Sequence, residues 1–360
     1  MAYTTIDDPS AHFQTVIWTG NDSNPRTILH DGNSDMQPDW LWHKLRSGIL
    51  SHMTYDSTRG VTKRLHIDQS EAEATQSDTG TVTAFTSDGF TVNAGTTNDL
   101  YVNDGSRTYV SWGWKANGGT TASNSNGSIT STVQANTDAG FSIVTYTGTG
   151  SNATVGHGLG AVPDMVIVKN RTASDNWGVQ LANALGNTNA LRLNNTDAYS
   201  GSNGALWWND TSPTSTTISI GTRNEVNQNT KNYVMYCFKN IQGYSKIGKY
   251  IGNGNANGTF VYTGFEPAWI MVKLSSAAGN SWQIVDNKRN PLNTGNGKRI
   301  FPNNTNAESS SDSEGFDFLS NGFKLRNSSG GGNTSGATYI YMAFAEHPFV
   351  SSEGVPTTAR

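Results

Sequence analysis

The sequence predicts an all-β protein built from three tandem antiparallel β-sandwich repeats with a jelly-roll-like arrangement. A motif pattern recurs three times along the 360 residues, which indicates repeated structural units. Short segments rich in β-branched and aromatic residues lie between Gly, Asn and Pro, as strands do. No sustained apolar period of 3.6 residues indicates a long helix. Strands separated by frequent turn signals favour sandwiches and jelly rolls.

The recurring pattern consists of two motifs at a nearly constant distance. Each copy has a Pro-led strand in which Lys lies six residues after Pro, and a closing strand that begins near a Tyr. The separations between Pro and Tyr are 71, 70 and 72 residues, so chance agreement is improbable. The positions are Pro38, Lys44 and Tyr109 in the first copy, Pro163, Lys169 and Tyr233 in the second, and Pro267, Lys273 and Tyr339 in the third.

These motifs divide the chain into six segments. They are an N-terminal arm (1–11), repeat 1 (12–115), a linker rich in Gly, Ser, Thr and Asn (116–140), repeat 2 (141–243), repeat 3 (244–349) and a C-terminal tail (350–360). Within the linker, residues 129–133 have the composition of an extra strand. The arm and the tail are expected to fray unless neighbouring subunits hold them.

The Pro-led segments are predicted to be central strands. In residues 40–44 a period of two places Trp40, Trp42 and Lys44 on one face and Leu41 and His43 on the other. The matching residues 165–169 of the second copy are apolar on both faces, as expected of a strand buried on both sides. Proline is expected at the first residue of each strand, where a missing backbone donor costs least.

Composition excludes several classes of partner. Charged residues are only 14%, the net charge is −4 and no Lys/Arg run occurs, so neither nucleic acid nor an anionic membrane surface is expected as a partner. No apolar run is long enough to insert in a membrane. Cys237 is the only cysteine, which excludes an internal disulfide framework and predicts a small buried side chain. Ten Trp, 13 Tyr and 13 Phe supply anchors for small cores.

The sequence contains no recognisable catalytic or cofactor-binding motif, so we expect no catalytic residues, no cofactor and no metal. Five of the seven histidines lie in repeat 1, but their spacing matches no compact metal-ligand pattern: His12, His30, His43, His52 and His66.

Carboxylate pairs are the other candidates for chemistry, because two carboxyl groups can hydrolyse glycosidic bonds. Their sequence surroundings are typical of solvated surface: Asp7 and Asp8, and Glu71 and Glu73. Two Asp-x-x-Arg elements stand at equivalent places in the outer copies and predict local ion pairs rather than sites. They are Asp56 with Arg59 and Asp286 with Arg289.

Aromatic residues are the better candidates for ligand binding, because flat rings stack on sugars. Trp207 and Trp208 lie in a stretch rich in Ser, Asn and Gly. In an extended segment they would point to opposite faces, so one of them is predicted to reach the surface and contact a glycan. Trp177 and Trp282 follow their prolines by 14 and 15 residues, and this shared offset predicts core positions.

Three segments carry a resemblance to a known family: MAYTTIDDP at the start with Phe13, residues 140–160 (GFSIVTYTGTGSNATVGHGLG) and residues 250–264 (YIGNGNANGTFVYTG). They resemble virion structural or tail-fibre-like proteins of marine phages, especially cyanophages. The resemblance implies a component of the virion exterior that is assembled in the host cytoplasm, with other virion proteins as partners. It brings no catalytic residues with it.

The leading functional hypothesis is therefore a non-enzymatic tail fibre or receptor-binding appendage that recognises host surface polysaccharide. Its repeats would be strung along an axis in a homo-oligomer, plausibly a trimer, with repeat 1 as the attachment unit and repeats 2 and 3 facing outward. The first alternative is a capsid-decorating knob or cement protein that binds the shell. The second alternative is a glycan depolymerase.

Overall fold

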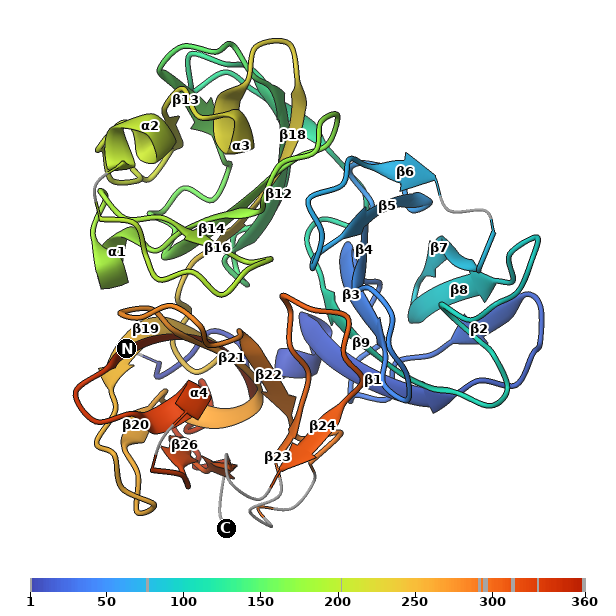
Figure 1. The fold of residues 1–360 in the computed structure, drawn as a ribbon. Coiled ribbons are helices and arrows are strands. Elements are labelled where there is room, and N and C mark those ends of the chain that lie inside the picture. The colour runs from blue at the N-terminus through green and yellow to red at the C-terminus, as the bar shows by residue number, and fades with distance from the viewer. Residues whose placement is uncertain are drawn as a thin grey trace.

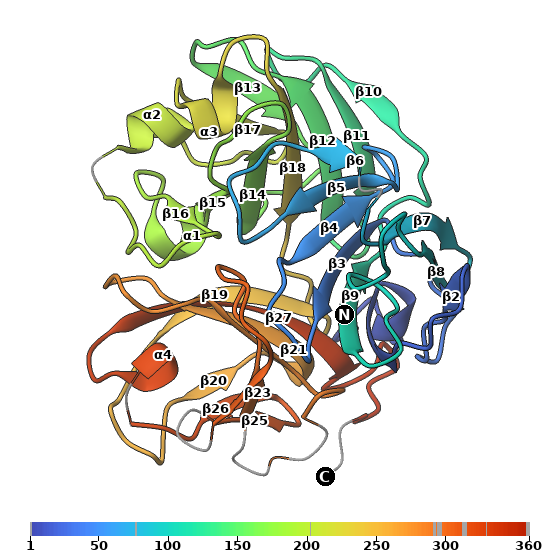
Figure 2. The same cartoon turned by 45° about the vertical axis from the view of Figure 1, so that its right-hand side comes forward.

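The protein is all-β, with antiparallel pairing between its strands and several open sheets. The computed structural model describes residues 2–75, 78–201, 203–290, 293, 297–311, 315–328 and 330–357. Three lobes surround a common centre, and two views show that none of them stands apart from the others (Figures 1 and 2). As predicted, the helices are short: η1 (Pro9–Ala11), α1 (Ala182–Leu185), α2 (Gly204–Trp208), α3 (Asn224–Asn227) and α4 (Gly330–Asn333).

The lobes follow one another along the chain. Lobe 1 contains β1 (Phe13–Thr19), β2 (Arg26–Ile28), β3 (Trp40–Leu45), β4 (Met53–Asp56), β5 (Lys63–His66), β6 (Ala74–Thr75), β7 (Thr81–Thr86), β8 (Gly89–Asn93) and β9 (Thr108–Trp114). Lobe 2 contains β10 (Ala122–Asn124), β11 (Ser131–Asn136), β12 (Phe141–Thr147), β13 (Ala153–Gly156), β14 (Met165–Asn170), β15 (Gly178–Gln180), β16 (Leu191–Arg192), β17 (Thr217–Ile220) and β18 (Asn232–Phe238). Lobe 3 contains β19 (Ser245–Ile251), β20 (Phe260–Tyr262), β21 (Phe265–Leu274), β22 (Gln283–Asp286), β23 (Gly297–Arg299), β24 (Ser309–Ser311), β25 (Phe316–Leu319), β26 (Gly322–Leu325) and β27 (Thr338–Pro348).

The main sheets of the three lobes share one strand order. It runs β1-β9-β3-β4 in lobe 1, β12-β18-β14-β15 in lobe 2 and β19-β27-β21-β22 in lobe 3. The Tyr-led closing strand is therefore always second and the Pro-led strand always third. Each lobe also has a smaller sheet, with the orders β2-β8-β7, β13-β17 and β20-β26-β25. The sequence motifs thus correspond to equivalent central strands.

The Pro-led strands β3, β14 and β21 are buried on both faces, as the sequence predicted. In β3, Leu41 and Leu45 belong to the core of lobe 1, whereas Trp40 and Trp42 belong to a second core shared by all three lobes. The alternation along one strand therefore divides its side chains between a core inside the lobe and a core between lobes. In lobe 2, Cys237 is buried in the lobe's own core, as predicted.

Three equivalent aromatic residues meet at the centre of the shared core. Trp114, Phe238 and Phe344 each lie five residues after the motif tyrosine of their lobe. Their ring centroids are 5.6 to 6.4 Å apart and their planes cross at 63 to 71°, so every pair packs edge to face. Such contacts add to the stabilisation from burial. The arrangement gives one chain an approximate threefold axis.

The stretch predicted as a linker is mostly part of lobe 2. Strand β11 pairs with the edge of β12, and β10 pairs with β11, which extends the main sheet by two strands. Ile129 forms an isolated bridge with Val155. The extra strand expected in residues 129–133 overlaps β11, which runs from Ser131 to Asn136. The polar composition of the stretch did not indicate that β10 would pair as well.

The arm and the tail are held by the chain itself. The Thr4 hydroxyl donates to the carbonyl of Gln242 (2.8 Å), and the Tyr3 hydroxyl donates to that of Gly264 (2.7 Å). The Asp7 carboxylate accepts from the backbone N–H of Ser352 (2.7 Å). Ser34 of lobe 1 also donates to Asp8 of the arm (2.6 Å). The described parts of the arm and the tail are therefore held by contacts within the chain.

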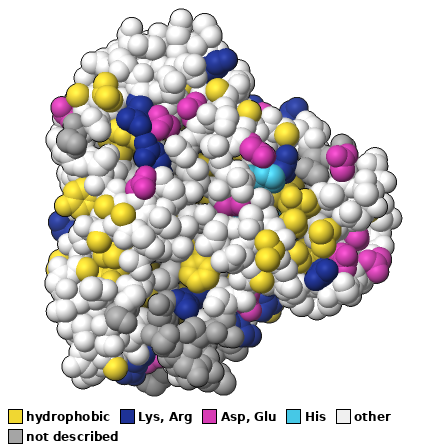
Figure 3. Space-filling view, viewed as in Figure 1, with side chains coloured by type: hydrophobic (Ala, Val, Ile, Leu, Met, Phe, Trp, Pro, Cys, Tyr) yellow, Lys and Arg dark blue, Asp and Glu magenta, His cyan; other side chains and the backbone are white. Residues whose placement is uncertain are grey.

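One face of the molecule carries mostly uncharged side chains (Figure 3). The face seen in Figure 3 shows scattered charged side chains and small hydrophobic patches between white polar atoms. Within the described residues, the structure contains no helix of the length and hydropathy that a membrane span requires.

Candidate functional site

The motif tyrosines act as identical clamps in the three lobes. Each hydroxyl donates to a carbonyl nine residues earlier, at Leu100, Asn224 or Gly330, over 2.5 to 2.9 Å. Each also accepts from a backbone N–H five residues earlier, over 2.6 to 3.0 Å. These bonds satisfy both functions of a buried hydroxyl. Tyr109, Tyr233 and Tyr339 therefore fix the loop before the closing strand.

The motif lysines connect the lobes in a cycle. Lys44, Lys169 and Lys273 are fully buried. Their ammonium groups donate to carbonyls of the adjoining lobe, at Thr305 (3.3 Å), Ser70 (2.9 Å) and Thr196 (3.4 Å) respectively. Burial lowers the pKa of each lysine to about 8. Lobe 1 thus contacts lobe 3, lobe 2 contacts lobe 1 and lobe 3 contacts lobe 2, so a set of head-to-tail interfaces closes into a ring.

The motif prolines are less uniform than predicted. Pro38 and Pro163 stand two residues before β3 and β14, close to the expected strand start. Pro267 instead lies inside β21, where the register with β27 shifts on both sides of it. A bulge tolerates proline because it leaves a backbone position outside the ladder.

The predicted core tryptophans also bridge the lobes. Trp177 and Trp282 are buried, and their indole N–H groups donate to the carbonyls of His66 (2.8 Å) and Arg192 (2.9 Å) in the adjoining lobe. His52 stands 14 residues after Pro38, at the equivalent position of lobe 1, and accepts from the indole N–H of Trp42 (2.9 Å). One histidine of repeat 1 therefore occupies a tryptophan position.

The Asp-x-x-Arg elements form the predicted ion pairs, at the centre of larger networks between lobes. In lobe 3, Arg289 Nε lies 2.6 Å from Asp286, and Arg289 also reaches Glu308, which Arg46 of lobe 1 binds over 2.8 Å. The indole N–H of Trp112 in lobe 1 donates to Asp286 (3.0 Å). The network closes the junction between lobes 3 and 1.

The junction between lobes 1 and 2 repeats this network. Arg59 pairs with Asp56 and with Glu73, and Arg171 of lobe 2 binds Glu73 over 2.9 Å. The Tyr236 hydroxyl donates to Asp56 (2.7 Å). Burial raises the pKa of Glu73, but the two arginines more than offset it and hold that pKa below its usual value. Glu73 was predicted on the solvated surface, but its side chain is only 12% exposed, and the two arginines explain why a carboxylate can lie there.

The third junction, between lobes 2 and 3, replaces these charged residues by apolar ones. Leu181 stands in the position of the aspartates, and Met342 in that of Tyr236 and Trp112. Both belong to the shared core. A backbone hydrogen bond crosses each charged junction, because the N–H groups of Glu308 and Glu73 donate to the carbonyls of Arg46 and Arg171 (both 2.8 Å). An equivalent bond is present here, from the N–H of Tyr199 to the carbonyl of Ser275 (3.0 Å). This junction has therefore lost both partners of the side-chain hydrogen bond, the aspartate in the middle copy and the aromatic donor in the third.

One of Trp207 and Trp208 was predicted to reach the surface, but both are buried. Their exposed fractions are 2% and 0%, and both rings lie in the core of lobe 2. The prediction assumed an extended segment, but these residues end helix α2, whose winding lets neighbouring side chains share one side. The guanidinium of Arg223 covers the Trp207 ring, 4.8 Å from its centroid. Neither ring offers a free face to a sugar.

The histidines of lobe 1 are mostly buried in structural roles. His43 Nε2 donates to the carbonyl of Tyr101 (2.5 Å), and Nδ1 accepts from the Ser111 hydroxyl (2.9 Å). Burial lowers the pKa of His43 to about 4, and burial followed by the charge of Arg64 does the same for His66. The described residues contain no group of three or more His, Cys, Asp or Glu side chains placed to hold a metal ion.

The lowered pKa values of these histidines predict a loss of stability in mild acid. An unfolded histidine takes up a proton near pH 6.5 while buried His43 stays neutral, so the unfolded state binds more protons as the pH falls from 6.5 toward 4. His43 alone accounts for up to about 3 kcal/mol of this loss. Urea unfolding should give a lower free energy of unfolding at pH 5 than at pH 6.8. His43→Gln should reduce the pH dependence, and equal stability of the wild type at both pH values would contradict the prediction.

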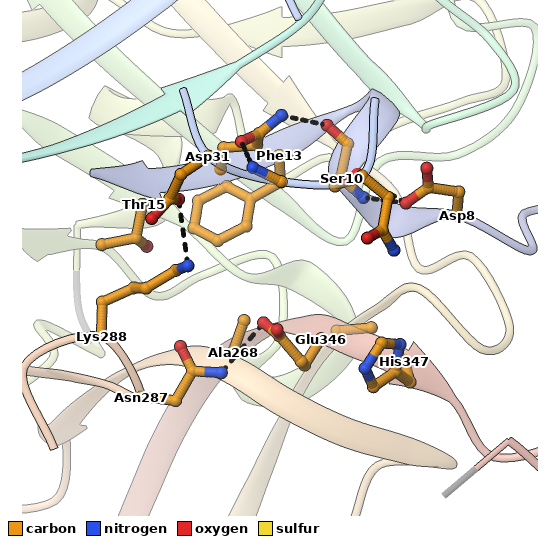
Figure 4. A pocket seen from close by; sticks show the side chains of 14 residues that line it. Asp8, Ser10, Phe13, Thr15, Asp31, Ala268, Asn287, Lys288, Glu346 and His347 are labelled. Atoms are coloured by element: carbon orange, nitrogen blue, oxygen red, sulfur yellow. Dashed lines mark hydrogen bonds and ion pairs between the residues drawn. The ribbon is translucent and has the colours of Figure 1, made fainter. Parts of the chain in front are cut away.

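A polar cleft opens at the junction between lobes 1 and 3. Its volume is about 180 Å³. Phe13 and Thr15 of β1 form one side, and Ala268, Asn287 and Glu346 of lobe 3 face them (Figure 4). An ion pair between Lys288 and Asp31 (3.0 Å) spans the two lobes at its rim.

Two polar atoms lining this cleft lack a hydrogen-bond partner among the described residues. They are Thr15 Oγ1, in a side chain that is 4% exposed, and Asn287 Oδ1. The amide nitrogen of Asn287 donates to Glu346 (2.9 Å), so its oxygen is the atom left to accept. Buried polar atoms are normally satisfied, and unsatisfied ones in a cleft indicate a ligand or bound water.

The equivalent space between lobes 1 and 2 is filled by the chain. There β11 places Gln134 beside Ile143, the residue that corresponds to Thr15. The Gln134 side-chain amide donates to the hydroxyls of Ser57 and Thr58 (both 2.9 Å) and accepts from the N–H groups of Asn117 and Gly119 (3.0 and 2.9 Å). An amide therefore fits this kind of cleft.

The third cleft, between lobes 2 and 3, is open but less polar on its strand side. Its volume is about 150 Å³, and Asp164, Asn183 and Ile247 are among its lining residues. Ile247 stands where lobe 1 has Thr15. Sequence reasoning missed Thr15 and Asn287, although comparing the copies would have shown one Thr against two Ile in otherwise similar strands.

Comparison with known proteins identifies one family. The model of a domain of unknown function, DUF7483, matches residues 8–348, and the chain belongs to this family. No curated protein and no solved structure matches the chain. The match spans all three lobes.

Proposed function

We propose that this member of the DUF7483 family is a non-enzymatic structural protein of a phage virion exterior, where it recognises host-surface glycans as part of a tail fibre or receptor-binding appendage. The sequence resemblance to marine phage virion proteins supports the location. The cleft between lobes 1 and 3 supports the binding activity and is the observation that carries the proposal. Clefts with a few converging polar groups are typical ligand sites.

The cleft has the chemistry that sugar hydroxyls require. Carboxylates of Asp31 and Glu346 accept hydrogen bonds, and Lys288 donates them. The space of about 180 Å³ is smaller than the usual range for drug-sized ligands, so it suits one sugar residue of a glycan rather than a long oligosaccharide. This site replaces Trp207 and Trp208 as the proposed contact.

The proposal includes the architecture of the appendage. Each lobe would be a two-sheet sandwich of jelly-roll-like kind, formed by its main and its smaller sheet. The three sandwiches would act as one rigid ring, because the lysine contacts join every lobe to both others and ion networks reinforce two of the three junctions. The threefold arrangement that we expected of a fibre trimer then exists within one chain, and an oligomer would be a stack or array of such rings.

The ring also favours the second candidate, a capsid-decorating protein. Three lobes that close on one another form a compact block, whereas a fibre would be expected to string them along an axis. A block of this shape suits attachment to a shell, with other virion proteins as partners.

Locating the protein on phage particles separates the two candidates. Gold-labelled antibody against the purified chain should mark the tail of particles that contain it; label over the shell would establish the decorating role instead. In parallel, the purified chain should be retained by immobilised host polysaccharide and not by dextran. Failure to bind any host polysaccharide would remove the receptor-binding role, and release of new reducing ends would show a depolymerase.

A further inference from the structure

We infer that the cleft between lobes 1 and 3 binds the acetamido group of an N-acetylated sugar. This inference rests on the proposed glycan recognition and names the chemical group that the site selects. It follows from the two unpartnered atoms, from the amide that fills the equivalent cleft, and from the apolar floor.

The unpartnered atoms match the two hydrogen-bonding functions of a secondary amide. Asn287 Oδ1 can only accept, so it needs an N–H or O–H from the ligand. Thr15 Oγ1 carries a proton that it can donate to a carbonyl oxygen. An acetamido group supplies one N–H and one C=O on opposite sides of a planar unit. It can therefore satisfy both lobes at once, with its N–H toward Asn287 and its C=O toward Thr15.

The filled cleft between lobes 1 and 2 shows an amide in the corresponding place. Gln134 lies beside Ile143 and donates to Ser57, which directly follows Asp56. Asn287 directly follows Asp286 and occupies the position of Ser57 in lobe 3. Lobe 1 has no strand before β1 that corresponds to β11, because β1 is the edge of its sheet. A ligand amide would take the place that the Gln134 amide takes in the other junction.

The apolar floor of the cleft suits the methyl group of an acetamido substituent. Phe13, Ala268 and Ala345 line it, and these side chains are 3%, 5% and 2% exposed. A methyl group placed on them would leave water for an apolar surface, which stabilises the bound state. A sugar with a plain hydroxyl at this carbon would offer neither the second hydrogen bond nor the methyl contact.

The test compares sugars that differ in the acetamido group alone. Titration of the full chain, followed by saturation-transfer NMR, should detect N-acetylglucosamine and N-acetylgalactosamine, with methyl resonances receiving the strongest transfer. Glucose and galactose should bind at least about tenfold more weakly, because each lost buried hydrogen bond leaves a protein atom unsatisfied. Equal binding of glucose and N-acetylglucosamine, or no binding of either acetamido sugar, would overturn the inference.

Variants assign the binding to this cleft. Thr15→Ile introduces the residue that Ile143 and Ile247 provide at the equivalent positions, so it should fold normally and lose the acetamido preference. Asn183→Ala, in the cleft between lobes 2 and 3, should bind as the wild type does. Unchanged binding by Thr15→Ile would refute the assignment.

Two further binding measurements, with host polysaccharide and with a peptide, distinguish this inference from the proposed function and from another ligand class. If the wild-type chain binds host polysaccharide but no acetamido sugar, the receptor-binding role stands and the inference fails. If neither binds, both fail. The peptide Ser-Thr-Val-Gln-Ala-Asn, copied from β11, tests an amide from a polypeptide; binding of this peptide in place of the sugars would identify the cleft as a protein-docking site.

Discussion

Replacing Asp286 by Leu is expected to lower the free energy of unfolding by about 3–5 kcal/mol, because removing one member of a buried ion pair leaves the other without compensation. Arg289 is 1% exposed and would share its remaining counter-charge, Glu308, with Arg46. The indole N–H of Trp112 would also lose its acceptor. Chemical unfolding followed by tryptophan fluorescence measures the change.

The junction between lobes 2 and 3 supplies the companion experiment. It holds Leu181 where the others hold aspartate, so an apolar version of the interface is already compatible with the fold. The double variant Asp286→Leu/Arg289→Met should therefore be more stable than Asp286→Leu alone, since no buried charge is left unpaired. As a control, Asp197→Leu removes an ion pair with Arg192 in which Asp197 is 53% exposed, and should change stability by at most about 1 kcal/mol. A double variant as unstable as the sum of the two single variants would argue against the coupling.

Replacing Trp114 by Ala is expected to destabilise all three lobes together, by about 3–5 kcal/mol or more. The indole contacts the rings of Phe238 in lobe 2 and of Trp269 and Phe344 in lobe 3. The cavity would therefore lie in the core that the lobes share. The wild type should unfold in one calorimetric transition whose van't Hoff and calorimetric enthalpies agree.

Hydrogen exchange tests whether the effect spreads beyond lobe 1. In Trp114→Ala, exchange should accelerate in β18 and β27 as well as in β9, because the shared core supports all three strands. Ile49→Ala is the control, since this side chain is 73% exposed and its loss should leave exchange unchanged. Faster exchange confined to lobe 1 would show that the lobes are independent.

The sequence located the equivalent strands but did not show how the lobes would pack. The constant distances from proline identified the motif lysines and tyrosines, because such spacing is a property of one chain segment. These residues are Lys44, Lys169 and Lys273, and Tyr109, Tyr233 and Tyr339. Their partners lie in other segments or other lobes, which no local pattern reveals. The two apolar faces of β14 were equally compatible with a sandwich interior and with contact between lobes. The all-β class with antiparallel sheets was therefore predictable, whereas the contacts that join the lobes in a cycle were not.

The candidate site was harder to predict because it depends on differences between copies. Trp207 and Trp208 attracted attention as large aromatic residues, but a five-residue helix inside a Ser/Asn/Gly-rich stretch gives little periodic signal. Thr15 is an ordinary residue for a strand, and Asn287 an ordinary one for a turn. Their unpartnered atoms become evident only in the folded chain, where lobe 3 packs against β1. In the equivalent cleft, Gln134 is bonded to Ser57.

Having three lobes on one polypeptide also sets the valence of the molecule. A homotrimer would carry any substitution three times and present three identical sites, whereas here Thr15 appears once, against Ile143 and Ile247. Each molecule would therefore hold a single acetamido site, with no avidity of its own. Firm adhesion would then depend on how many copies a particle displays and how closely they are spaced, since effective concentration falls as the distance between linked sites grows.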